Sequence, residues 1–175
     1  MRAGTLLFGL MLSSAVLLAD DRTILFDPEV DFSTFKTFAL RDGTMDSQRP
    51  ELNSAITIKK LTDTVRGALI GRGLKESPDP ADLVVEYSVK AQDFGLGIFG
   101  RANPIGSRGR GGAQASTPDF TDATLVIDLK AGDPRAMVWR GVYRDTESTA
   151  PKLADALPKH ATKLLSEYPP KKKKA

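Results

Sequence analysis

The stretch ATLVIDLKAGDPRAMVWRGVYR, residues 123–144, is typical of two β-strands joined by a tight turn. Its first half places a large apolar residue at every second position: Leu125, Ile127 and Leu129. This spacing belongs to a strand that has one face on an apolar core. A Gly-Asp-Pro turn follows at 132–134, and residues 137–144 return as the partner strand. The stretch therefore predicts an antiparallel hairpin.

Three other segments have the composition of strands. Residues 83–91 repeat the alternation, with one face formed by Leu83, Val85, Tyr87, Val89 and Ala91. Two shorter runs, 23–26 and 36–40, are rich in β-branched and aromatic residues. The polar residues 41–51 contain glycine and proline, and we expect them to form a loop.

Two segments have the spacing of amphipathic helices. After a possible cap at Asn53 or Ser54, apolar residues recur every three or four positions up to a Gly-Arg-Gly stop at 71–73. The second helix is expected over 151–168, where apolar residues again fall on one face. Pro158 is unfavourable inside it, so the helix either kinks there or begins there.

These elements predict a single α+β domain over residues 20–168. Its largely antiparallel sheet has about five strands, two amphipathic helices cover one face, and a flexible glycine-rich loop over 93–122 separates two strands. Residues 169–175 are expected to be a disordered basic tail. The pattern contains no parallel βαβ unit.

Residues 1–19 have the features of an export signal. Arg2 supplies a positive start, residues 6–18 are mostly apolar, and Ala19 is a small residue at the expected cleavage point. The mature chain is then expected to begin at Asp20, in the periplasm or outside the cell. The alternative is a retained N-terminal membrane anchor, although the apolar run is shorter than the roughly 20 residues that span a bilayer. The chain has no cysteine, which excludes disulfides and thiolate metal sites.

The positive charge of the chain lies mainly in its last residues. The formal net charge is +3; without Arg2 it is +2, and without the tail lysines as well it is −2. These lysines are Lys171, Lys172, Lys173 and Lys174. We therefore expect no nucleic-acid partner, and at most a weak contact between the tail and an anionic membrane.

The glycine-rich segment contains a G-x-G-x-x-G pattern at Gly95, Gly97 and Gly100. In a nucleotide site this pattern must begin a helix that faces the phosphates, and the residues that follow here cannot start one. We interpret the segment as a solvated loop. Three arginines in it could contact an anionic surface: Arg101, Arg108 and Arg110.

No group of residues has the composition of an active site, and no cofactor or metal is expected. His160 is the only histidine, and a packed or surface position on the last helix explains it better than catalysis. Asp27, Glu29 and Asp31 alternate as a loose calcium site might, but turn capping is the better interpretation. Asp79, Asp82 and Glu86 could serve as paired acids only in a cleft that the sequence does not reveal.

Several segments in order resemble a bacterial family called domain of unknown function 4136, which contains small envelope proteins and lipoproteins. They are DFSTFKTFA at 31–39, ADLVVEY at 81–87, TLVIDL at 124–129, VWRG at 138–141 and YPP at 168–170. The resemblance implies an α+β fold and an envelope location, and it implies no activity. The chain departs from many members at Asp20, where they carry a lipid-bearing cysteine.

We therefore expect a non-catalytic exported protein that binds another envelope component through its sheet or its glycine-rich loop. The alternative is a carrier of a small molecule, lipid or glycan in a groove between helices and sheet, with Trp139 or Tyr143 as a stacking platform. An enzyme of unrecognised type is the third possibility.

Overall fold

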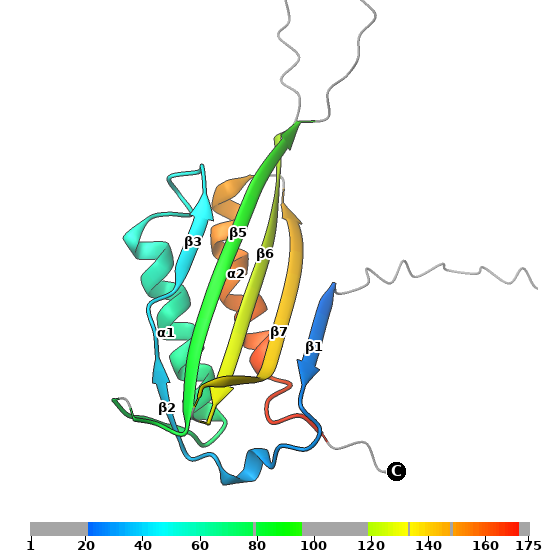
Figure 1. Cartoon of the computed structure of the whole chain (residues 1–175). Helices are drawn as coiled ribbons and strands as arrows, with labels where there is room; N and C mark the ends of the chain where they lie inside the picture. The colour runs from blue at the N-terminus through cyan, green and yellow to red at the C-terminus, as the bar shows by residue number, and fades with distance from the viewer. Residues whose placement is uncertain (1–20, 79, 96–118, 133, 148, 172–175) are drawn as a thin grey trace, which may run out of the picture.

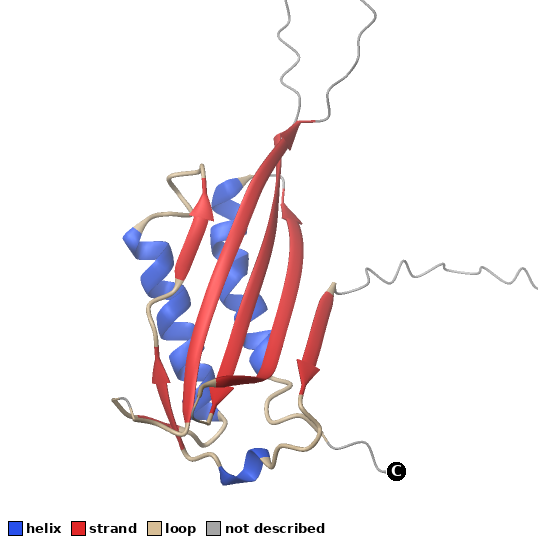
Figure 2. Ribbon diagram, viewed as in Figure 1, coloured by secondary structure: helices blue, strands red, loops and turns tan. Residues whose placement is uncertain are grey.

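The computed structural model describes residues 21–78, 80–95, 119–132, 134–147 and 149–171. They form one seven-stranded sheet with two α-helices packed against one of its faces (Figures 1 and 2). The predicted α+β class is confirmed, and the strand number is seven instead of about five. Residues 1–19, where the sequence predicts an export signal, lie outside the described residues.

The sheet has the order β1-β7-β6-β5-β2-β4, and β3 also pairs with β5. The strands are β1 (Arg22–Phe26), β2 (Thr37–Leu40), β3 (Thr44–Ser47), β4 (Lys75–Glu76), β5 (Leu83–Gly95), β6 (Asp119–Ala131) and β7 (Ala136–Glu147). A short 3-10 helix, η1 (Phe32–Thr34), lies between β1 and β2.

The predicted hairpin is confirmed as β6 and β7, which pair antiparallel and turn at Gly132 with a φ of 80°. β5 and β6 extend further than expected, to Gly95 and from Asp119, so both ends of the predicted 93–122 loop belong to strands. The alternating residues align across these strands, with Val85 opposite Leu129 and Leu129 opposite Trp139. This alignment gives the sheet one continuous apolar face.

The other half of the sheet is parallel. β2 and β3 both pair with β5 in parallel, and helix α1 (Ala55–Gly71) lies in the connection. The expectation that no parallel βαβ unit is present is therefore wrong. The loop predicted at 41–51 contains β3. Its polar composition gives no strand signal, because β3 is held by backbone pairing with β5 and not by apolar side chains.

Helix α1 forms as its sequence predicts. The Ser54 side chain caps it by accepting a hydrogen bond from Thr57 N at 3.1 Å. The buried face consists of Thr57, Leu61, Val65 and Leu69. Gly73 follows the helix with a φ of 87°, which suits a chain reversal that glycine makes at low cost.

Helix α2 (Ala150–Leu165) begins well before Pro158 and contains it. The alternative in which the helix starts at Pro158 is therefore wrong. Thr149 caps the helix, and the absent amide of Pro158 is offset by a strongly apolar inner face. That face consists of Leu153, Leu157, Ala161, Leu164 and Leu165. α2 packs on β6 and β7 and beside α1.

Trp139 is the largest fully buried side chain and fills the space between β7 and α2. Its indole lies over Gly141, where a Cβ atom would come within 2.6 Å of Trp139 Cη2 and 3.3 Å of Leu164 Cβ. Tyr168 meets the indole edge-on at a centroid distance of 6.3 Å. Burial raises the pKa of Tyr168 to about 12, so its hydroxyl stays protonated at neutral pH.

The close approach of Trp139 to Gly141 can be tested with two alanine substitutions. Gly141→Ala should lower the free energy of unfolding by about 1–3 kcal/mol, because the new methyl group meets a buried indole that cannot move away. Gly67→Ala should raise it by about 0.5–1 kcal/mol, because Gly67 lies in α1 with open space around it. Urea unfolding of both variants measures the difference. Equal stabilities would contradict this account of the core.

Candidate binding site

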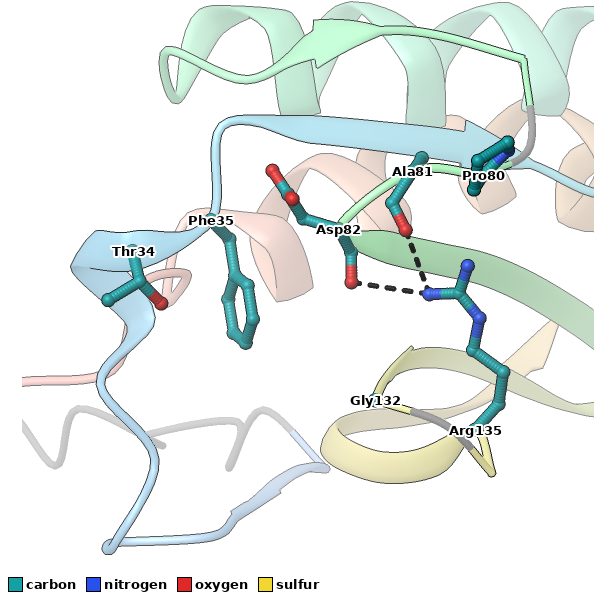
Figure 3. A pocket seen from close by; sticks show the side chains of 7 residues that line it. All are labelled: Thr34, Phe35, Pro80, Ala81, Asp82, Gly132 and Arg135. Carbon is teal, nitrogen blue, oxygen red and sulfur yellow. Dashed lines mark hydrogen bonds between the residues drawn. The ribbon is translucent and has the colours of Figure 1, made fainter.

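A hollow of about 700 Å³ opens at the end of the sheet where β2 and β5 begin and where β6 turns into β7 (Figure 3). Three separate segments line it, as Figure 3 shows: Thr34 and Phe35, then Pro80, Ala81 and Asp82, then Gly132 and Arg135. Its volume falls within the range of about 300–1,000 Å³ typical of ligand sites.

The Asp82 carboxylate fixes the side of the hollow that lies next to the start of β2. Its Oδ2 atom accepts hydrogen bonds from Lys36 N at 2.8 Å, Thr37 N at 2.9 Å and Thr37 Oγ1 at 2.9 Å. In return, Asp82 N donates to Thr37 Oγ1 at 3.0 Å. These bonds join the first residue of β2 to the residue that precedes β5.

The short helix η1 sets the position of Phe35. Asp31 begins it by accepting hydrogen bonds from Ser33 N at 3.1 Å and Ser33 Oγ at 2.7 Å. The chain then becomes extended at Phe35, whose ring meets Phe32 edge-on at 6.0 Å. Phe32 is buried, so the half-buried ring of Phe35 rests against the core while it lines the hollow.

Arg135 forms the opposite wall and comes from the turn between β6 and β7. Its Nη1 atom donates to the carbonyl oxygens of Ala81 at 2.9 Å and Asp82 at 3.3 Å (Figure 3). The guanidinium is therefore held in one orientation across the hollow from the ring of Phe35.

The hydrogen bonds from Lys36 N and Thr37 lower the pKa of Asp82, with a smaller contribution from the charge of Arg135. The carboxylate is therefore ionised at neutral pH, and a single one of its oxygens receives three donors. It has no proton to donate, and it is a weak base. The hollow combines a fixed aromatic ring, a fixed cation and an internally bonded carboxylate.

The residues expected from the sequence to contact a ligand lie elsewhere. Trp139 is fully buried and Tyr143 is 6% exposed, so neither presents a ring to solvent as a stacking platform. The space between helices and sheet that would have formed a groove is filled by these side chains and by α2. The three loop arginines Arg101, Arg108 and Arg110 lie outside the described residues. Lys171 is exposed, and the three lysines after it are not described.

His160 is buried between α2 and β7, at 8% exposure. Its Nε2 atom lies 2.5 Å from Asp145 Oδ2, and its ring stacks on Tyr143 at a centroid distance of 3.8 Å. Nδ1 is buried, with no hydrogen-bond partner in the described part of the chain. Of the two predicted positions, packed or on the surface, the structure shows the packed one, and the contact with Asp145 holds α2 on β7.

The other acidic residues singled out in the sequence have separate partners. Asp27 Oδ1 accepts from Glu29 N at 2.9 Å and Asp31 caps η1, which confirms the turn-capping interpretation. Glu86 pairs with Lys130 at 2.6 Å and does not share a site with Asp82. Asp79 lies outside the described residues. Within the described ranges no three His, Asp or Glu residues are placed to hold a metal ion.

Sequence reasoning missed Phe35 and Arg135 as lining residues. Phe35 and Asp82 belong to the DFSTFKTFA and ADLVVEY segments, which were conspicuous in the sequence but had no local pattern that joined them. Arg135 follows a glycine-proline turn, and its contact with residues more than fifty positions earlier has no sequence signal.

Replacement of Asp82 tests whether its carboxylate holds the site together. Asp82→Asn should lower the free energy of unfolding at pH 7 by about 1–2 kcal/mol, because a neutral amide oxygen accepts weaker hydrogen bonds from Lys36 N and Thr37 N than the carboxylate does. Because the folded pKa is lowered, the carboxylate stabilises the protein above the usual aspartate pKa of about 3.9 and stops doing so as the pH falls through the lowered value. The difference from the wild type should therefore shrink in acid, as urea unfolding at several pH values would measure.

The control for this prediction is Asp155→Asn, which removes a carboxylate that is 77% exposed and pairs with Lys60. Such a surface pair contributes little, so this variant should unfold like the wild type. A loss in Asp155→Asn as large as that in Asp82→Asn would contradict the account.

The fold is similar to two solved structures of low sequence identity. One is a PDZ domain protein from Parabacteroides distasonis, with 14% identity and a TM-score of 0.58 over 88% of this chain. This chain spans only 36% of that protein. The other is a DUF4136 family protein from Bacteroides thetaiotaomicron, with 16% identity and a TM-score of 0.54 over 85% of this chain and 95% of that one. At these identities the likeness concerns the fold alone.

No curated protein matches the chain. The family comparison gives a clear result, because residues 23–170 match the model of the family described as domain of unknown function (DUF4136). The matched range includes every described strand and helix except the first residue of β1. The chain belongs to the DUF4136 family.

Proposed function

We propose that this DUF4136 protein is a non-catalytic binding protein of the bacterial cell envelope, and that the hollow lined by Phe35, Asp82 and Arg135 is where it holds another envelope component. The observation that carries this proposal is that the two charged side chains of the hollow are already hydrogen-bonded within the protein. Asp82 and Arg135 both form internal hydrogen bonds that fix their positions.

A binding role fits these contacts better than a catalytic one. General acid–base catalysis requires a group whose pKa lies near the working pH and which can reach the substrate proton. The hydrogen bonds to Asp82 move its pKa in the opposite direction. Nucleophilic catalysis is commonly assisted by a base beside the nucleophile, and the only histidine is buried against Asp145 and Tyr143. Fixed walls, in contrast, reduce the entropy cost of binding.

The envelope location rests on two observations. Residues 1–19 have the pattern of an export signal, and the resemblance to the DUF4136 family implies an envelope location. Among the residues that the structure describes, no helix is both long enough and apolar enough to cross a membrane. We propose that the chain is exported and cleaved near Ala19.

A carrier of a small molecule, lipid or glycan is the second candidate, and the volume of the hollow favours it. The ligand would sit in the hollow and not between helices and sheet, where Trp139 and Leu157 are fully buried. The hollow is bounded by Phe35 on one side and Arg135 on the other, so it suits a flat or apolar group that also interacts with a cation.

Photo-crosslinking in living cells tests the proposed function. A photoreactive phenylalanine analogue at Phe35 should form an adduct with an envelope component after irradiation, and its mass distinguishes a protein adduct from a lipid or glycan. The same analogue at Ile56, which is 81% exposed on α1, is the matched control and should form none. Arg135→Ala should weaken the adduct at Phe35, because the wall opposite the ring is lost.

Two results would overturn the proposal. Equal labelling at Phe35 and Ile56, or none at Phe35, would remove the hollow as a binding site. Turnover of an ester, glycoside or peptide substrate that disappears in Asp82→Asn would show a catalytic function instead.

A further inference from the structure

The two edges of the sheet are built differently. On one edge, β4 has only two residues, and both Lys75 and Glu76 are charged and exposed. On the same side, β3 carries Asp46, and its last carbonyl, that of Ser47, accepts a hydrogen bond from the Asn53 side chain at 2.5 Å. Short length, charge and side-chain contacts are the usual protections of an edge strand against further pairing.

The other edge, β1, has fewer of these protections, because its only charged residue is Arg22 at its start. The residues from Thr23 to Phe26 contain no charge and no proline, and all have high β propensity or are apolar. Leu25 is 52% exposed and Phe26 is 37% exposed, on opposite faces of the strand. Phe26 is held in place by an edge-on contact with the buried ring of Phe32 at 6.3 Å. The strand is therefore exposed at its outer edge and also held in place by its pairing with β7 and by the contact between Phe26 and Phe32.

The hydrogen-bond pattern identifies which backbone groups of β1 face outward. β1 pairs with β7 antiparallel, and the bonds Arg144 N to Asp21 O and Asp27 N to Val138 O belong to this ladder. In an antiparallel ladder every second residue bonds inward, so Thr23 and Leu25 bond to β7. The N–H and C=O groups of Ile24 and Phe26 point away from the sheet, and no described strand pairs with them.

An acidic turn follows the open edge. Asp27 and Glu29 are exposed directly after β1, and in the described part of the chain neither forms an ion pair. A second copy of β1 is a poor partner, because antiparallel pairing centred on Ile24 places Asp21 of one copy opposite Asp27 of the other. A segment with a basic residue at this end would instead be attracted.

We propose that the outer edge of β1 receives an extended segment of a partner polypeptide by strand addition. The segment bonds to the outward backbone groups of Ile24 and Phe26, and its centre is uncharged and β-prone. Its Lys or Arg residues lie beside Asp27 and Glu29, which in antiparallel addition means at its N-terminal end. This surface is separate from the hollow, so the outcome at one does not decide the outcome at the other.

Two peptide probes with blocked ends test the proposal on protein purified after expression of the full chain. One is Lys-Arg-Thr-Val-Thr-Val-Thr, and the other replaces the first two residues by Asp-Glu. The basic peptide should bind with a Kd about tenfold or more below that of the acidic one. The net charge of the chain is +3, so attraction to the protein as a whole would give the opposite preference.

Three variants locate the binding surface. Ile24→Pro removes an outward N–H and leaves the inward bonds of Thr23 and Leu25, so it should abolish binding while the helical circular dichroism and the Tm show that the protein is still folded. Glu29→Lys should weaken the basic peptide at least about threefold by charge repulsion. Glu51→Lys makes the same charge change at an exposed position before α1 and should leave the Kd unchanged.

Amide exchange provides a second measurement that does not depend on the variants. The N–H groups of Ile24 and Phe26 should exchange more slowly in the presence of the basic peptide, because they become hydrogen-bonded. The proposal is overturned if neither peptide binds at millimolar concentration, if both bind equally, if folded Ile24→Pro still binds, or if Glu29→Lys and Glu51→Lys behave alike.

Discussion

The hydrogen bonds of the Asp82 carboxylate are the interaction on which the end of the sheet around the hollow depends. The carboxylate joins the residue before β5 to the start of β2. Its bond to Thr37 N links two residues that are 45 positions apart in the chain. Parallel strands have no hairpin turn to set their register, so a side chain that receives several backbone N–H groups can set it instead. With Asp82 bonded to the start of β2, the position of Phe35, two residues before β2, is also set. Arg135 then reaches the carbonyl oxygens of Ala81 and Asp82.

The antiparallel half of the sheet and both helices could be predicted because their apolar spacing is strong. The alternation in residues 83–91 and 123–144 led directly to β5, β6 and β7, and the cap at Ser54 to α1. β3 and β4 could not be predicted, because they are short and polar and form only where β5 and β2 offer a free edge. Pro158 is tolerated within α2 because tertiary packing outweighs local propensity.

The candidate site was harder to predict than the fold for a related reason. Aromatic residues drew attention to Trp139 and Tyr143, yet in this fold the rings that alternate inward on β7 are core residues. The hollow is lined by a turn arginine and a half-buried phenylalanine, residue types that occur on any surface. Only the fold brings them together. The family resemblance identified two of the three lining segments without showing that they meet.

The hollow and the edge of β1 lie on two sides of one aromatic cluster. Phe32 contacts Phe35, which lines the hollow, and Phe26, which lies in the edge strand. Hydrogen–deuterium exchange of the purified protein, with and without a solubilised envelope fraction, tests the claim that this end of the sheet is where the protein binds. We expect this claim to be met by slower exchange in β1 and in the residues beside Phe35 and Arg135, and by no change on the outer face of α1. Protection confined to α1, or none anywhere, would contradict it.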